Sequence, residues 1–84
     1  MSCPKRVVLY LKMKTYIREY RSFLERLKQA RLDAKLTQME VARLLSRPQS
    51  FVSKSESGER RVDFVELTHL AKIYKKPVHF FEIN

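Results

Sequence analysis

Three places in the sequence carry the signature of a helix start, which is an oxygen-bearing side chain followed three residues later by glutamate. The pairs are Ser22 with Glu25, Thr37 with Glu40, and Asp63 with Glu66. In such a capping box each of the two side chains accepts a hydrogen bond from the backbone N–H of the other residue. The chain has one glycine and three prolines, which leaves little material for hairpin turns. The sequence therefore predicts an all-α fold with a helix beginning after each box.

Apolar residues recur at intervals of three and four after each box, the spacing that gives a helix one buried face. The stripes run from Phe23 to Ala34, from Val41 to Leu45 and from Phe64 to Tyr74. Residues 49–56 are predicted to form another helix, since Pro48 suits a helix N-terminus and Gly58 suits a left-handed C-cap. A last helical turn after Pro77, in which Phe80 and Phe81 close the core, brings the expected number of helices to five.

The N-terminal residues form a basic extension of less certain structure. Residues 1–21 hold six Lys or Arg residues and a single acid. Val7 to Leu11 has the composition of a short strand, whereas residues 16–23 keep helical spacing, so that 15–34 could be one helix interrupted by the first capping box. We therefore divide the chain into an extension, residues 1–21, and a helical domain, residues 22–84.

The charge balance points to a polyanionic partner. Eighteen Lys and Arg residues against nine Asp and Glu give a net charge of +9, with a pI near 10.1. Nucleic acid is the leading candidate, and an anionic membrane surface is the second. The apolar run Val7 to Leu11 is too short for a signal peptide or a membrane span. The single cysteine, Cys3, allows no internal disulfide, which suits a reducing cytoplasm.

Residues 36–61 follow the plan of a helix-turn-helix, in which a short helix, a tight turn and a second short helix succeed one another. This segment resembles the Cro-type (XRE-family) helix-turn-helix domain. The matching features are Thr37-Gln38, the small residue Ala42, Val52, Ser53-Lys54 and the Glu56-x-Gly58 ending. The resemblance covers about residues 22–83 and implies a five-helix, lambda-repressor-like domain that binds double-stranded DNA.

The second helix of the motif is predicted to lie in the major groove. Its outward side chains should be polar, and it offers Gln49, Ser50, Ser53 and Lys54 for contacts with base edges. The resemblance implies that Gln38 contacts a backbone phosphate and that Phe51 lies near the sugar-phosphate backbone or a thymine methyl. We expect further ion contacts with the DNA backbone from Arg43, Arg47, Arg60 and Arg61. The resemblance also implies a structural ion pair between Arg31 and Glu56, which would hold this helix at its angle.

The sequence departs from the family pattern at several turns. Lys35 and Ser46 stand where relatives usually have glycine, so a left-handed backbone there would cost about 1 kcal/mol. Ser55 replaces a larger apolar residue, which leaves either a gap or a polar contact. Pro48 takes the place of the usual N-cap serine.

No catalytic or metal-binding pattern emerges from the sequence. His69 and His79 lack Cys or carboxylate companions at ligand spacing, and the serines lack a histidine base. We therefore expect no enzyme activity, no metal and no cofactor.

The resemblance implies a cytoplasmic, nucleoid-associated transcriptional regulator of prokaryotic or phage origin, most simply a repressor. We expect a homodimer on a palindromic operator, with Val7 to Leu11, Phe80 and Phe81 at the dimer surface. An antagonist or toxin protein is a further expected partner. Two alternatives stay open: an antitoxin or adaptor for which DNA binding is secondary, and attachment of residues 5–21 to a membrane surface.

Overall fold

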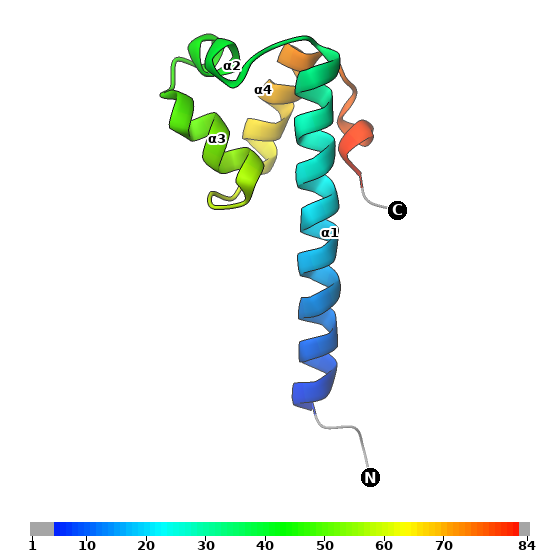
Figure 1. The fold of residues 1–84 in the computed structure, drawn as a ribbon. Helices are drawn as coiled ribbons and strands as arrows, with labels where there is room; N and C mark the ends of the chain where they lie inside the picture. Colours follow the sequence, from blue (N-terminus) through cyan, green and yellow to red (C-terminus); the bar gives the residue numbers. More distant parts are fainter. Residues whose placement is uncertain (1–4, 83–84) are drawn as a thin grey trace.

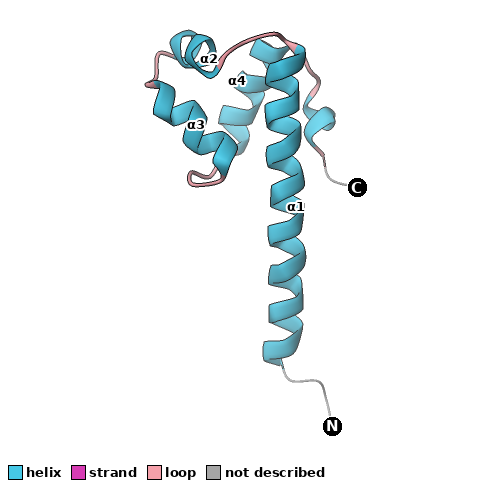
Figure 2. Cartoon of the chain, viewed as in Figure 1, coloured by secondary structure: helices cyan, strands magenta, loops and turns pink. Residues whose placement is uncertain are grey.

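The computed structural model describes residues 5–82, with side chains from residue 15 onward. The elements are α1 (Lys5–Asp33), α2 (Gln38–Leu45), α3 (Gln49–Ser57), α4 (Phe64–Tyr74) and the 3-10 helix η1 (Val78–Phe81). Within residues 5–82 there is no strand, which confirms the all-α class (Figure 2). The expected fifth helix is only the short 3-10 turn η1, so the domain has four α-helices rather than five.

Helix α1 is the dominant element of the molecule. Its 29 residues span about 43 Å at 1.5 Å per residue. The C-terminal half packs beside the other helices, whereas the N-terminal half projects away from them (Figure 1). The principal extents of the molecule, 56 × 23 × 19 Å, reflect this projection. No described helix has a stretch both long and apolar enough to cross a membrane.

The expected helix start at Ser22 is wrong. Ser22 lies inside α1, and its hydroxyl donates to the carbonyl of Arg18 at 3.3 Å instead of capping a helix. A helix that already runs through this point supplies partners for the backbone N–H groups, so none is left for a cap to satisfy. The strand alternative for Val7 to Leu11 is also wrong, because these residues are helical. The proposed boundary between residues 21 and 22 therefore falls within a continuous helix.

The other two capping boxes are confirmed. At α2, Thr37 Oγ1 accepts from Glu40 N at 3.1 Å and Glu40 Oε1 accepts from Thr37 N at 2.9 Å. At α4, Asp63 and Glu66 exchange the equivalent bonds at 2.7 and 3.0 Å.

The turns that end the helices use the left-handed region, as the sequence suggested. Gly58 has φ 89°, and the non-glycine residues Lys35 and Ser46 have φ 59° and 56°. Lys75, at the end of α4, also has a left-handed backbone conformation, with φ 57°, which the sequence analysis did not predict. Three of these four turns therefore place a side chain where glycine is preferred.

A small core joins all the elements. Its buried apolar residues are Leu27, Ala30, Val41, Ala42, Val52, Leu70, Ala71, Tyr74 and Phe81. Phe81 packs edge-on against Phe23 and Phe80. Phe81 closes the core as expected and is only 3% exposed. Phe64, which we expected in the apolar stripe of α4, is 68% exposed because it stands at the first, solvent-facing turn.

Candidate nucleic-acid interface

The position of α3 is fixed by its buried face. Val52 and Ser55 are buried against the core, and the small side chain of Ala42 allows α2 to approach closely. The N–H of Arg47 donates to the carbonyl of Ala42 at 2.9 Å and closes the turn between the two helices. On the opposite side of α3, Gln49, Ser50 and Lys54 are exposed and Ser53 is half-buried. All four residues expected to contact bases therefore lie outside the core, on one polar surface of α3.

A chain of polar contacts runs from α1 to the start of α3. Arg31 donates to both carboxylate oxygens of Glu56, at 2.6 and 3.1 Å, and to the carbonyl of Leu36 at 2.9 Å. Gln38 Nε2 donates to Glu56 Oε1 at 3.1 Å, and Gln49 Nε2 donates to Gln38 Oε1 at 2.8 Å. We call this series, from Arg31 through Glu56 and Gln38 to Gln49, the polar relay.

The polar relay begins at a buried ion pair and ends at the protein surface. The Arg31 and Glu56 side chains are 10% and 6% exposed, whereas Gln49 is exposed. The bond to Glu56 raises the pKa of Arg31 against the opposing effect of burial, so the guanidinium stays charged. Because every link is a hydrogen bond between side chains on separate helices, the relay fixes the orientation of the Gln49 amide before any ligand arrives.

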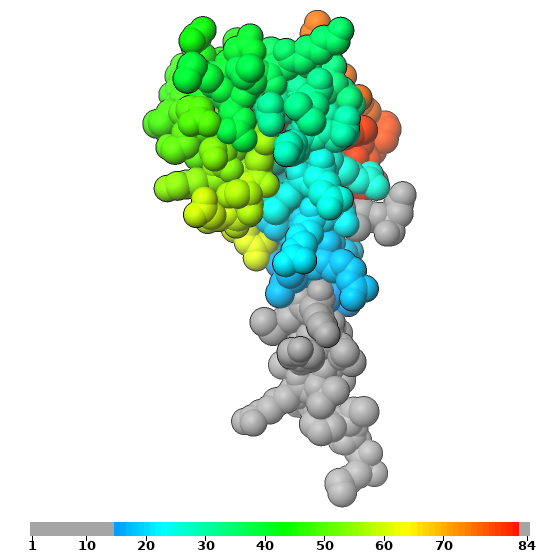
Figure 3. Space-filling view, in the orientation of Figure 1, coloured from blue at the N-terminus to red at the C-terminus, as the bar shows by residue number. Residues whose placement is uncertain are grey.

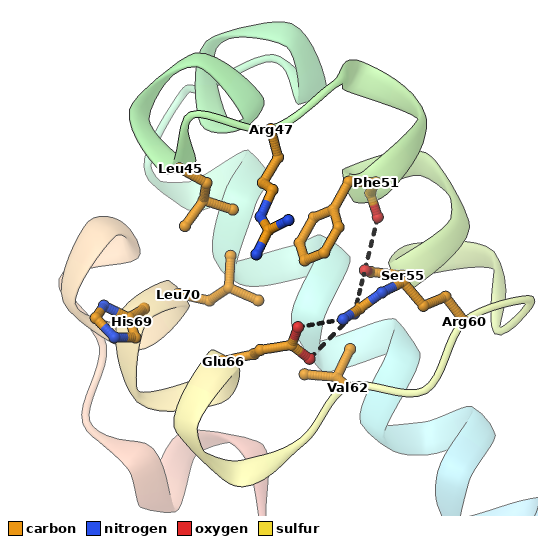
Figure 4. A pocket seen from close by; sticks show the side chains of 9 residues that line it. All are labelled: Leu45, Arg47, Phe51, Ser55, Arg60, Val62, Glu66, His69 and Leu70. Atoms are coloured by element: carbon orange, nitrogen blue, oxygen red, sulfur yellow. Dashed lines mark hydrogen bonds and ion pairs between the residues drawn. The ribbon is translucent and has the colours of Figure 1, made fainter.

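Two residues expected at the DNA backbone, Phe51 and Arg60, also make contacts within the fold. The ring of Phe51 packs against the core, with the guanidinium groups of Arg60 and Arg47 at 4.0 and 5.4 Å from its centroid (Figure 4). Arg60 forms a two-pronged ion pair with Glu66 and also donates to the carbonyl of Arg61 at 3.1 Å. Phe51 and Arg60 therefore hold the loop after α3 against α4. Sequence reasoning missed this because Glu66 belongs to a different helix.

The small side chain of Ser55 leaves a cavity beside it and also makes polar contacts. Its hydroxyl donates to the carbonyl of Phe51 at 2.7 Å and accepts from Arg60 at 3.5 Å. Beside it lies a cavity of about 220 Å³ that reaches to Leu45, Leu70 and His69 (Figure 4). A larger side chain at position 55 would occupy part of this space.

Arg61 is held by aromatic side chains of α1. Its guanidinium lies 4.9 Å from the ring centroid of Tyr16 and 4.4 Å from that of Tyr20, and it donates to the Tyr16 hydroxyl. Tyr20 in turn accepts a hydrogen bond from the N–H of Val62 at 3.1 Å. The first described side chains of α1 accordingly lie beside the α3–α4 loop in the space-filling view (Figure 3). The spacing of Tyr16 and Tyr20 by four residues was the only sequence signal for this support.

Arg43 and Arg47 are exposed on α2 and on the turn that follows it. Lys54 on α3 and Arg61 in the loop beyond it are exposed as well, so the motif carries four exposed cations. Gln38, the first residue of α2, lies where helix N–H groups have no partner within the helix, which suits a phosphate. The motif thus offers cationic groups and free N–H groups for DNA phosphates, together with a set of hydrogen-bonding side chains.

A helix with an exposed polar face, presented by a tight turn and accompanied by exposed cations, is the arrangement of a DNA-binding helix-turn-helix. The family profile of the helix-turn-helix domain matches residues 22–78, and the chain belongs to this family. The match agrees with the Cro-type (XRE-family) resemblance. No curated protein and no solved structure matches the chain.

Proposed function

We propose that the chain is a sequence-specific DNA-binding transcriptional regulator, acting as a repressor, that inserts α3 into the major groove. The observation that carries this proposal is the polar relay, because it ends in the exposed amide of Gln49. A glutamine amide can donate to N7 of adenine and accept from its N6 amino group. The major groove is about 12 Å wide and admits a helix. An amide held in one orientation loses less side-chain entropy on binding.

The surrounding side chains fit the remaining roles. Ser50, Ser53 and Lys54 share the base-facing surface with Gln49, whereas Gln38, Arg43, Arg47 and Arg61 are placed to contact phosphates. Phosphate contacts set the register of a protein on DNA, and base contacts give specificity. The net charge of +9 adds a general attraction to the duplex.

Further parts of the proposal concern the biological setting. We propose that the protein acts in the cytoplasm on nucleoid DNA, as a homodimer on a two-fold operator, because one short helix covers few base pairs. It needs no cofactor and catalyses no reaction. Its activity is set by its own concentration or by an antagonist or toxin protein.

The test compares a base contact with a phosphate contact. Gln49→Ala should lose about 1 to 3 kcal/mol on the preferred duplex, selected from a random pool, and little on random duplex. Arg61→Ala should weaken both alike and reduce the slope of log Kd against log salt by about one. Equal losses for Gln49→Ala on both duplexes would make the chain a nonspecific nucleic-acid binder. Intact specific binding without repression in cells would favour the antitoxin or adaptor role.

A further inference from the structure

The apolar stripe of α1 does not end where the domain ends. Spacings of four and three alternate along it, through Leu9, Met13, Tyr16, Tyr20, Phe23 and Leu27. Such a pattern keeps one seam facing a partner along the whole helix. Phe23 and Leu27, at the C-terminal end of the seam, pack into the core. Tyr16, in contrast, is 52% exposed. Leu9 and Met13 belong to the N-terminal half of α1, which projects from the rest of the domain (Figure 1).

A groove continues this seam onto the domain. It measures about 370 Å³ between α1 and α4, and its walls include Tyr20, Phe23, Phe64, Leu67 and Phe81. Three carboxylates, those of Glu19, Asp63 and Glu82, border the groove. On a chain with only nine acids and eighteen bases, three acids around one apolar groove form a local negative rim.

The occupant that matches this groove is the start of α1 itself. In the stretch 5–14, positions Lys5, Leu9, Lys12 and Met13 fall on the face of α1 along which the seam runs. These basic and apolar residues complement the acidic rim and the apolar walls. Because α1 is continuous from Lys5 to Asp33, its first turns are directed away from the groove of their own chain. The α1 helix of a second copy, in contrast, can reach it.

We propose that two copies pair through the projecting halves of their α1 helices, in antiparallel orientation about a two-fold axis near Tyr16. Parallel pairing would set Lys5 and Lys12 beside the same bases of the other copy, whereas antiparallel pairing carries them toward the acidic rim. Leu9 of one copy then lies level with Phe23 of the other, and Lys12 lies within one residue of the level of Glu19. This inference shares with the proposed function only the expectation of a homodimer. It adds the surface through which the two copies pair.

The experiment measures self-association of the full chain without DNA, by sedimentation equilibrium over a concentration series. Met13→Asp and Leu9→Asp should each weaken the dimer at least about a hundredfold, because a charge would be buried in the seam. Leu11→Asp is the matched control, since position 11 lies on the opposite face of α1, and it should change the dimer Kd by less than about threefold. Circular dichroism shows that each variant remains folded.

Charge reversal tests the orientation. Lys12→Glu and Glu19→Lys should each weaken the dimer about tenfold, and the double variant should regain most of the loss. Failure of the double variant to recover would overturn the antiparallel pairing. A wild-type chain that stays monomeric at high concentration, or equal weakening by Leu11→Asp and Met13→Asp, would overturn the interface. A dimer of this kind that does not discriminate between DNA sequences would instead overturn only the regulator proposal.

Discussion

Both flanks of α3 are secured by an arginine–carboxylate pair, and the two pairs differ in burial. On the α1 side, Arg31 and Glu56 are 10% and 6% exposed and continue through Gln38 to Gln49. On the α4 side, Arg60 and Glu66 are 33% and 23% exposed and end at the ring of Phe51. The first pair connects the core to the proposed DNA-contacting surface, and the second closes a loop. The same chemistry thus serves two tasks, and the pair linked to the proposed DNA-contacting surface is the more buried of the two.

The largest expected effect comes from breaking the buried pair. Arg31→Ala should lower the free energy of unfolding by about 2 to 4 kcal/mol, because it leaves the buried Glu56 carboxylate without its cation. Urea melts of Arg31→Ala, Glu56→Ala and the double variant measure this. The double variant should cost less than the sum of the singles, since the second substitution removes the orphaned group. Strict additivity would show that the two side chains contribute independently.

Breaking the half-exposed pair should cost less. Arg60→Ala should lower the free energy of unfolding by about 1 to 2 kcal/mol, from the loss of a solvent-screened ion pair and of the contact with the Phe51 ring. Arg60→Lys is the control, because lysine keeps the charge but loses the two-pronged geometry, and it should fall between Arg60→Ala and wild type. A loss for Arg60→Ala as large as that for Arg31→Ala would remove the distinction between the two flanks.

Acid should weaken the α4 flank in a way that a single substitution can isolate. The bond from Arg60 holds the pKa of Glu66 below its ordinary value, and so does the capping bond within the Asp63 box. A folded pKa below the unfolded one stabilises the fold above the unfolded pKa, and this stabilisation is lost as pH falls through the folded pKa. Urea melts between pH 7 and pH 3 should therefore show a shallower acid loss for Glu66→Gln than for wild type. Identical pH profiles would show that Glu66 does not contribute.

How far the sequence predicted this structure depends on the range of each interaction. The boxes at Thr37 and Asp63 are local and follow turns, so they formed as expected. The same pattern at Ser22 failed because α1 already extends through it. In that part of α1, the Tyr20 hydroxyl accepts a hydrogen bond from the N–H of Val62, 42 residues away in sequence.

The candidate site, too, could be predicted from the sequence only where local patterns determine it. The polar side chains on the outer face of α3 follow from helical periodicity once Val52 is placed in the core. The inward position of Phe51 and the pairing of Arg60 with Glu66 depend on how α4 packs against α3, and no local pattern encodes that packing. The link from Gln38 to Glu56 likewise joins two helices and emerged only from the structure.

The smallest expected effect lies at the turn that leads into α3. Ser46 has φ 56° and ψ 43°, and its N–H donates to the carbonyls of Ala42 and Arg43. Glycine keeps these bonds and relieves a strain of about 1 kcal/mol, but it also makes the unfolded chain more flexible. Ser46→Gly should therefore stabilise the fold by only about 0.5 kcal/mol, measured as a higher urea midpoint with an unchanged slope.

Lys75 provides the matched control for this turn, since it has φ 57° and ψ 41°, the same cap bonds, and a position at the end of α4 away from the proposed DNA surface. Lys75→Gly should raise stability by the same small amount and leave DNA affinity nearly unchanged apart from the lost charge. If Ser46→Gly lowered stability while Lys75→Gly raised it, the serine side chain would contribute more to the turn than its strain costs. The entry to α3 would then be held by a side chain, as both of its flanks are, and not by backbone bonds alone.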